Sequence, residues 1–157
     1  MHKIQTIALV VGIGFGTSAV AADPMELKTS DRAVLGAAEV AAGDYVGGIS
    51  KSERALRHAN HNLVKAPALI NLCVAHAATG SLDRADEYCS AAVETGVDTA
   101  LAYNNRAVVH YLRGDIESCI ADLERAAELQ AGSRVIKRNL TRARSKQAMT
   151  VASAISA

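Results

Sequence analysis

Apolar residues recur at helical spacing along most of this chain, and glycines or small polar residues interrupt the pattern at short intervals. Ser81 and Ser133 stand where a helix N-cap is expected, and Gly43, Gly96 and Gly114 stand where helices end. A run of Thr29, Ser30 and Asp31 can cap the first helix. The pattern predicts seven helices, at about residues 31–42, 45–59, 66–80, 82–95, 100–113, 115–130 and 134–147.

The middle of the chain repeats itself after 34 residues. The asparagine at 71 recurs at 105 and again at 139, and three further pairs keep the same step: His76 and His110, Gly80 and Gly114, Ala92 and Ala126. A fixed period of this length in helical sequence indicates stacked helix–turn–helix units. Gly80 and Gly114 fall at the predicted turns, so their role is structural.

The repeated residues resemble the degenerate pattern of the tetratricopeptide repeat family. The better copy contains Ala100, Tyr103, Ala107, Tyr111, Gly114, Ile120, Ala121 and Ala126. The preceding copy contains Leu69, Leu72, Cys73, His76, Gly80, Ala85, Cys89 and Ala92. A weaker copy upstream contains Leu35, Gly36, Gly43, Tyr45, Gly48 and Ala55.

This resemblance implies an all-α, right-handed α-solenoid of about three helical hairpins closed by a C-terminal helix. The weak repeat spans 29–62, the two better repeats 66–97 and 100–131, and the capping helix 133–147. Residues 23–28 are interpreted as a linker and 148–157 as a flexible tail. In the last helix Ile136, Leu140 and Ala143 share one face, and cations occupy the rest, as a solenoid end requires.

Residues 1–22 have the form of a secretory signal peptide. Lys3 precedes an apolar run at 7–15 that is short for a membrane span, and small residues end at Ala21 and Ala22. We expect cleavage after one of these two alanines and a periplasmic or secreted protein. An uncleaved anchor is the competing interpretation, which Asp23 and Pro24 disfavour.

Charge and chemistry narrow the function classes. The chain has 17 Lys and Arg against 16 Asp and Glu, so nothing global favours a nucleic-acid partner. His58 and His61 lack a nearby carboxylate or cysteine, so we expect no metal site and no cofactor. Cys73 and His76 lack an orienting acid, so no catalytic residue is proposed and the protein is not expected to be an enzyme.

The three cysteines leave two alternatives open. Cys73 and Cys89 flank Gly80 at distances that let them face each other across a hairpin, and an exported protein can form that disulfide. Cys119 would then stay free. Alternatively, all three are small buried apolar residues.

The first helix of each hairpin corresponds to the ligand-binding concave surface of the resembled family. Here that surface is an apolar trough with a basic end, and the residues expected to bind a protein or peptide partner are Ile70, Val74, Asn104, Val108, Tyr111, Arg138 and Arg142. The chaperone-binding members hold a terminal carboxylate with a cationic cluster, and the matching positions here include no cation. Asn71, Asn105 and Asn139 lie one position off this face, and we expect them to bond neighbouring backbone between repeats.

The sequence therefore predicts an exported scaffold or adaptor that binds protein through its concave surface. The alternative function is assembly or envelope attachment through the basic C-terminal helix, since six cations there could meet an acidic protein or an anionic lipid surface. Peripheral membrane contact has no other support in the sequence.

Overall fold

The computed structural model describes residues 7–8, 24–30, 32 and 34–155. Within them the helices are α1 (Ala37–Ala42), α2 (Tyr45–Arg57), α3 (Asn62–Ala78), α4 (Leu82–Glu94), α5 (Thr99–Arg113), α6 (Ile116–Leu129) and α7 (Arg134–Ile155). Two short strands, β1 (Ile7–Ala8) and β2 (Glu26–Leu27), pair antiparallel. Apart from β1, the predicted signal peptide lies outside the described residues.

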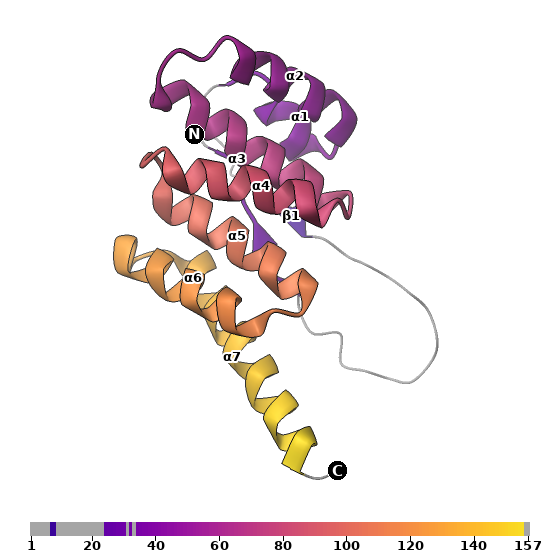
Figure 1. The fold of residues 1–157 in the computed structure, drawn as a ribbon, viewed down its shortest axis with the longest axis vertical. Helices are drawn as coiled ribbons and strands as arrows, with labels where there is room; N and C mark the ends of the chain where they lie inside the picture. The colour runs from indigo at the N-terminus through magenta and orange to yellow at the C-terminus, as the bar shows by residue number, and fades with distance from the viewer. Residues whose placement is uncertain (1–6, 9–23, 31, 33, 156–157) are drawn as a thin grey trace.

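The helices form three successive hairpins that stack along the long axis of the molecule (Figure 1). The pairs are α1 with α2, α3 with α4, and α5 with α6, and α7 packs on α6 at the end of the stack. Gly80 and Gly114 have φ angles of 79° and 84°, a conformation that favours glycine, and they make the turns of the second and third hairpins. The predicted solenoid of three hairpins and a closing helix is confirmed.

Two glycines explain how the thin first hairpin packs. Helix α1 has only six residues, and Gly36, the N-cap residue directly before it, has a φ of 94°. A Cβ atom at Gly48 would lie 2.4 Å from a side-chain carbon of Val40, so α1 and α2 approach closely only because residue 48 has no side chain.

The helix predicted to start near Asp31 starts six residues later, and the described part of the predicted linker, residues 24–28, contains strand β2. The backbone of residues 24–30 forms hydrogen bonds with side chains of α3, α5 and α7 instead of forming a helix of its own. Residues 24–30, called the N-terminal segment below, therefore belong to the folded domain.

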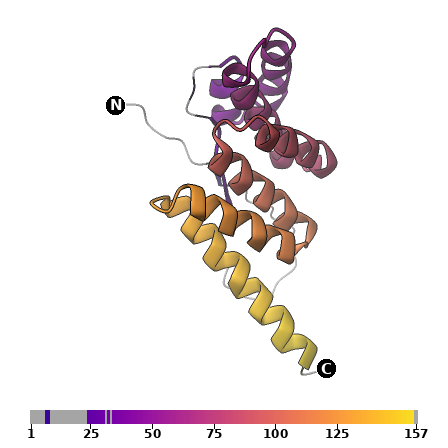
Figure 2. The same ribbon diagram turned by 60° about the vertical axis from the view of Figure 1, so that its left-hand side comes forward.

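Two further helix boundaries differ from the sequence prediction. Helix α3 begins at Asn62 rather than 66, so Pro67 lies in its second turn and leaves the carbonyl of Leu63 without its intrahelical N–H partner. Helix α7 continues to Ile155 and extends well past α6 (Figure 2), where we predicted a flexible tail from residue 148. No glycine or proline follows Ser133, so nothing in the sequence ends the helix.

An ion pair fixes the packing of the third hairpin. Arg106 of α5 donates two hydrogen bonds of 2.8 Å to the two carboxylate oxygens of Asp122 in α6, and a third, of 3.3 Å, to Ser90 in α4. The hydrogen bonds to Asp122 raise the pKa of Arg106. This network orients α5, which contributes two asparagines to the groove described next.

Candidate functional site

Three repeat-related asparagines line one face of the stack. Asn71 of α3, Asn105 of α5 and Asn139 of α7 are fully buried and follow one another at the 34-residue step of the repeat. We call them the asparagine ladder, and we call the face of α3, α5 and α7 that bears them the groove. The N-terminal segment lies in this groove.

The ladder binds the backbone of the N-terminal segment at every second residue. Asn139 accepts a hydrogen bond from the Glu26 N–H and donates one to the Glu26 carbonyl, both at 3.0 Å. Asn105 does the same with Lys28, at 3.0 Å for the bond from the N–H and 2.7 Å for the bond to the carbonyl. Each carboxamide thus pairs with a residue as a neighbouring strand would.

The third member makes half of this contact. Asn71 accepts a hydrogen bond of 3.3 Å from the Ser30 N–H, and its buried side-chain nitrogen has no partner among the described residues. Successive asparagines thus bind residues 30, 28 and 26, so the segment runs antiparallel to the order of the repeats. Two residues of extended chain advance about 7 Å, which sets the step of the ladder along the groove.

Asn104 connects two members of the ladder. It accepts a hydrogen bond of 2.9 Å from Asn139, donates one of 3.2 Å to the Glu26 carbonyl and lies 3.3 Å from the side-chain oxygen of Asn105. These contacts fix which way each amide points. The residue predicted to bind a partner therefore binds the chain's own backbone.

The expectation that the three asparagines bond backbone between neighbouring repeats was wrong. Their backbone partners lie 41, 77 and 113 residues away in sequence. The side chains lie on the groove face itself, not one position off it, because the extended segment is packed against that face.

Apolar side chains of the N-terminal segment form part of the core. Met25 and Leu27 are 5% and 1% exposed, and they belong to the same buried cluster as Val74, Val108 and Ile136. Two of the predicted partner-binding residues, Val74 and Val108, are thus buried in the cluster that includes the segment. Ile70 lies in a second buried cluster with Leu69, Ala92 and Ala102.

The basic end of the predicted trough contacts the start of the same segment. Arg138 forms an ion pair with the buried carboxylate of Glu26, and Arg142 donates a hydrogen bond to the carbonyl of Pro24. Both arginines come from α7, which places them beside Asn139. Both arginines, which we expected to bind a partner, thus contact groups of the chain itself.

Tyr111 lies apart from the N-terminal segment. Its ring is partly buried against the main core cluster, and the ammonium group of Lys146 lies 4.2 Å from its centroid. Sequence reasoning chose it as a binding residue because it is a central aromatic position in an otherwise small-residue surface. In the structure it fixes α7 against α5.

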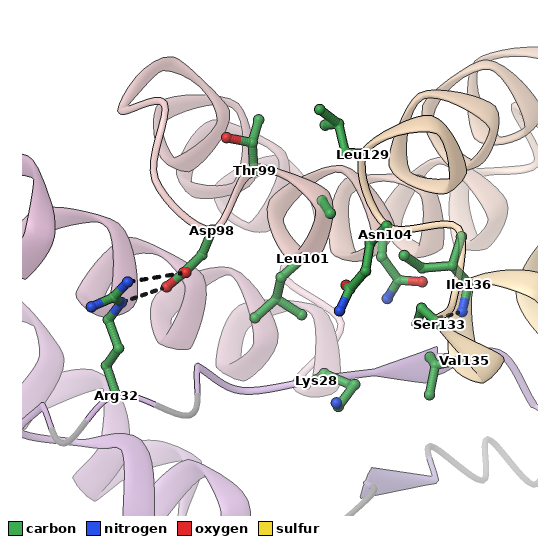
Figure 3. Close-up of a pocket in the computed structure, with 12 residues that line it drawn as sticks. Lys28, Arg32, Asp98, Thr99, Leu101, Asn104, Leu129, Ser133, Val135 and Ile136 are labelled. Atoms are coloured by element: carbon green, nitrogen blue, oxygen red, sulfur yellow. Dashed lines mark hydrogen bonds and ion pairs between the residues drawn. The ribbon is translucent and has the colours of Figure 1, made fainter.

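A cleft of about 640 Å³ opens beside the N-terminal segment (Figure 3). Lys28 and Arg32 lie on one side of it, and Asp98, Leu101 and Asn104 line it further along. Its far side comes from the loop between α6 and α7 and from the start of α7. Arg32 forms an exposed ion pair of 2.9 Å with Asp98 across the cleft, and this pair raises the pKa of Arg32.

Within the described part of the chain, the three cysteines and His76 form no hydrogen bond or ion pair with the N-terminal segment. Cys73 and Cys89 form a disulfide with Cα atoms 5.1 Å apart, a usual separation, and Cys119 is buried and free. Burial raises the pKa of the Cys119 thiol to about 12. His76 stacks on Tyr88 with ring centroids 5.3 Å apart.

The described residues include no group of three His, Cys, Asp or Glu side chains arranged to hold a metal ion. In the same part of the chain, no helix has the length and apolar content needed to cross a membrane.

Comparisons with known proteins identify the fold. No family model and no curated protein matches the sequence. Among solved structures, the second TPR domain of human RPAP3 in complex with the HSP70 peptide SGPTIEEVD matches with a TM-score of 0.59 at 18% identity, covering 69% of this chain and 88% of that one. The C-terminal TPR-containing domain of an FK506-binding protein from Plasmodium falciparum matches with a TM-score of 0.64 at 16% identity, covering 73% and 85%.

At these identities the likeness concerns the fold. Three observations agree on that fold: the order of the hairpins, the 34-residue step of the asparagines and the matched structures. The chain has the tetratricopeptide repeat fold.

Proposed function

We propose that this protein is an exported interaction scaffold that binds an extended segment of another polypeptide along its groove. The observation that supports this most strongly is the asparagine ladder, which holds the N–H and C=O groups of alternate residues of an extended chain. Such contacts depend on backbone conformation rather than on residue identity. The groove is therefore built for extended polypeptide.

The similar RPAP3 domain is solved with a peptide, which supports a peptide ligand for this fold. The positions that hold a terminal carboxylate in the chaperone-binding members carry no cation here, so we propose that the groove binds an internal segment. Each backbone hydrogen bond contributes about 0.5–1.5 kcal/mol, and buried apolar side chains contribute the rest of the affinity.

Export remains part of the proposal and rests on the sequence alone. Lys3, the apolar run at 7–15 and the small residues at Ala21 and Ala22 support it. Mass spectrometry of the exported protein should find an N-terminus at Ala22 or Asp23. An intact Met1 on membrane-bound protein would contradict cleavage.

The alternative, attachment through the basic face of α7, has less support. Four of its six cations contact groups of the chain itself: Arg138 with Glu26, Arg142 with Pro24, Arg144 with Glu124 and Lys146 with Tyr111. These contacts reduce the charge that α7 can present to an acidic protein or a lipid surface. We propose no catalytic activity.

Site-specific photocrosslinking in the native host tests the function. A photoreactive residue replaces Val135, which lines the cleft, or Val46, which is 80% exposed on α2. We expect a defined protein crosslink from position 135 and none from position 46. The crosslink should vanish when Asn105→Ala and Asn139→Ala are combined. Equal crosslinking from both positions, or crosslinks to lipid alone, would contradict the proposal.

A further inference from the structure

Three consecutive residues of the N-terminal segment are buried: Met25, Glu26 and Leu27, at 5%, 7% and 1% exposure. Side chains of an extended chain alternate between two faces, so a fully buried run means that the groove encloses both faces. The ladder contacts only backbone and accepts many sequences. Selection among extended chains must therefore come from the side-chain positions of these three residues.

The two outer positions require apolar side chains. Met25 and Leu27 lie in the main core cluster with Val74, Val108 and Ile136. A polar side chain at either position would lose its water without gaining a hydrogen-bond partner. The first element of selection is therefore an apolar residue at both outer positions.

The middle position favours an acid. One carboxylate oxygen of Glu26 meets Arg138, and the other is buried without a partner among the described residues. Arg142 donates a hydrogen bond to the carbonyl of Pro24, two residues before Glu26. A basic side chain at the middle position would place a third cation beside two arginines, and a neutral one would leave Arg138 without its anion.

The N-terminal segment is also attached in a way that allows exchange. It forms no helix of its own and is held by side chains of other elements and by the pairing of β2 with β1. The exposed ion pair of Arg32 and Asp98 lies just beyond its far end. The cleft runs along the segment at Lys28 and Arg32, so a second chain can reach the groove from that side (Figure 3).

Resting on the proposed function, we propose that the groove selects partner segments with an acidic residue between two apolar residues, and that these bind by displacing residues 24–30. The N-terminal segment then acts as an internal ligand of the same pattern. Because it is tethered, its effective concentration is on the order of millimolar, so the wild-type chain binds an external ligand more weakly than a chain whose own segment is impaired.

Fluorescence anisotropy with a labelled heptapeptide of residues 24–30 tests both parts. The full-length wild-type chain is compared with full-length Met25→Ser/Leu27→Ser, and with Glu26→Lys, which keeps the apolar residues in case the double variant does not fold. We expect each variant to bind the peptide at least tenfold more tightly than the wild type. Equal affinity for all three chains would overturn displacement.

Charge exchange tests the selectivity. In the Met25→Ser/Leu27→Ser chain, a peptide carrying Glu26→Lys should bind at least tenfold more weakly than the native peptide. Adding Arg138→Glu to the chain should reverse that preference. The same comparison in the Glu26→Lys chain is the safeguard against unfolding of the double variant.

The outcomes separate this inference from the proposed function. If acidic and basic peptides bind equally and Asn105→Ala abolishes both, the selectivity is refuted and the groove still binds extended chain. Free exchange of the amides at positions 26 and 28 shows that the N-terminal segment has left the groove. If no peptide binds a chain in that state, the proposed function fails as well. A mass of two chains in sedimentation of the wild type would identify a second copy as the occupant and overturn an external partner.

Discussion

Asn105 pairs with Lys28 as one strand pairs with another, although the two residues are 77 positions apart. Its carboxamide accepts from the Lys28 N–H at 3.0 Å and donates to the Lys28 carbonyl at 2.7 Å. Without Asn105, the N–H and the carbonyl of Lys28 would be partly buried and would lack these hydrogen bonds. This pairing joins the N-terminal segment to a helix in the middle of the stack.

Replacing Asn105 should therefore destabilise the whole domain. Asn105→Ala leaves the backbone groups of Lys28 unpaired, and we expect a loss of about 1–3 kcal/mol in the free energy of unfolding. Urea denaturation followed by circular dichroism measures it. Asn60→Ala is the matched control, since Asn60 is exposed between α2 and α3, and it should change stability by less than about 0.5 kcal/mol. Equal losses for both variants would contradict the role of the ladder.

The sequence predicted the stacking but not what fills the groove. The spacing of Gly80, Gly114 and the three asparagines indicated the hairpins, because helical repeats keep a fixed period. The extended segment at residues 24–30 was missed because its backbone forms hydrogen bonds with side chains 41 to 118 residues away. Its one local signal is the alternation of Met25, Glu26, Leu27 and Lys28, which is too short to distinguish a strand from a linker.

Only some of the residues predicted to bind a partner contact the N-terminal segment. Asn104, Arg138 and Arg142 contact the N-terminal segment, and helical periodicity was enough to place them on the groove face. The depth of Ile70 depends on how closely α3 and α4 pack, which periodicity does not give. Arg32 and Asp98 were overlooked because Arg32 was expected in the first turn of a helix and Asp98 lies between two predicted helices.

Thiol counting tests the disulfide between Cys73 and Cys89. Under denaturing, non-reducing conditions we expect one reactive thiol per chain, that of Cys119. The native protein should show none, because Cys119 is buried and its pKa is about 12. Removing the bridge with Cys73→Ser/Cys89→Ser should cost about 3 kcal/mol of stability, given the 16-residue separation. Three thiols in the denatured wild type would show that the bridge does not form.

Stability should fall in mild acid because of His76. Burial, helped by the nearby charge of Arg84, lowers the pKa of His76 below its ordinary 6.5, and neither ring nitrogen has a partner among the described residues. A lowered pKa means that the folded state disfavours the proton, so this contribution to stability is complete above pH 6.5 and is lost as the pH falls below it.

Urea midpoints at pH 7.5 and 5.5 measure this effect. His76→Phe keeps an aromatic ring against Tyr88 and should reduce the difference between the two midpoints. The matched control is His58→Phe, which replaces an exposed histidine directly after α2. A difference that is the same in wild type and His76→Phe would show that other groups titrate instead.

Tyr111→Ala should affect stability rather than binding. The ring packs against the core and under Lys146, and the described contacts of the N-terminal segment do not include it. We expect a loss of about 1–3 kcal/mol in the free energy of unfolding and unchanged affinity for the labelled heptapeptide. Tyr111→Phe keeps the ring and should behave like the wild type. Weaker peptide binding with unaltered stability would instead place Tyr111 at the binding site.

Amide hydrogen exchange measured by NMR tests the central claim, that the asparagine ladder holds an extended chain in the groove. The Glu26 and Lys28 amides should exchange slowly, because they donate to Asn139 and Asn105, and Asn105→Ala should release Lys28 first. Adding excess heptapeptide of residues 24–30 should raise both exchange rates together. Exchange of both amides in the wild type at the rate of a free peptide would contradict the account.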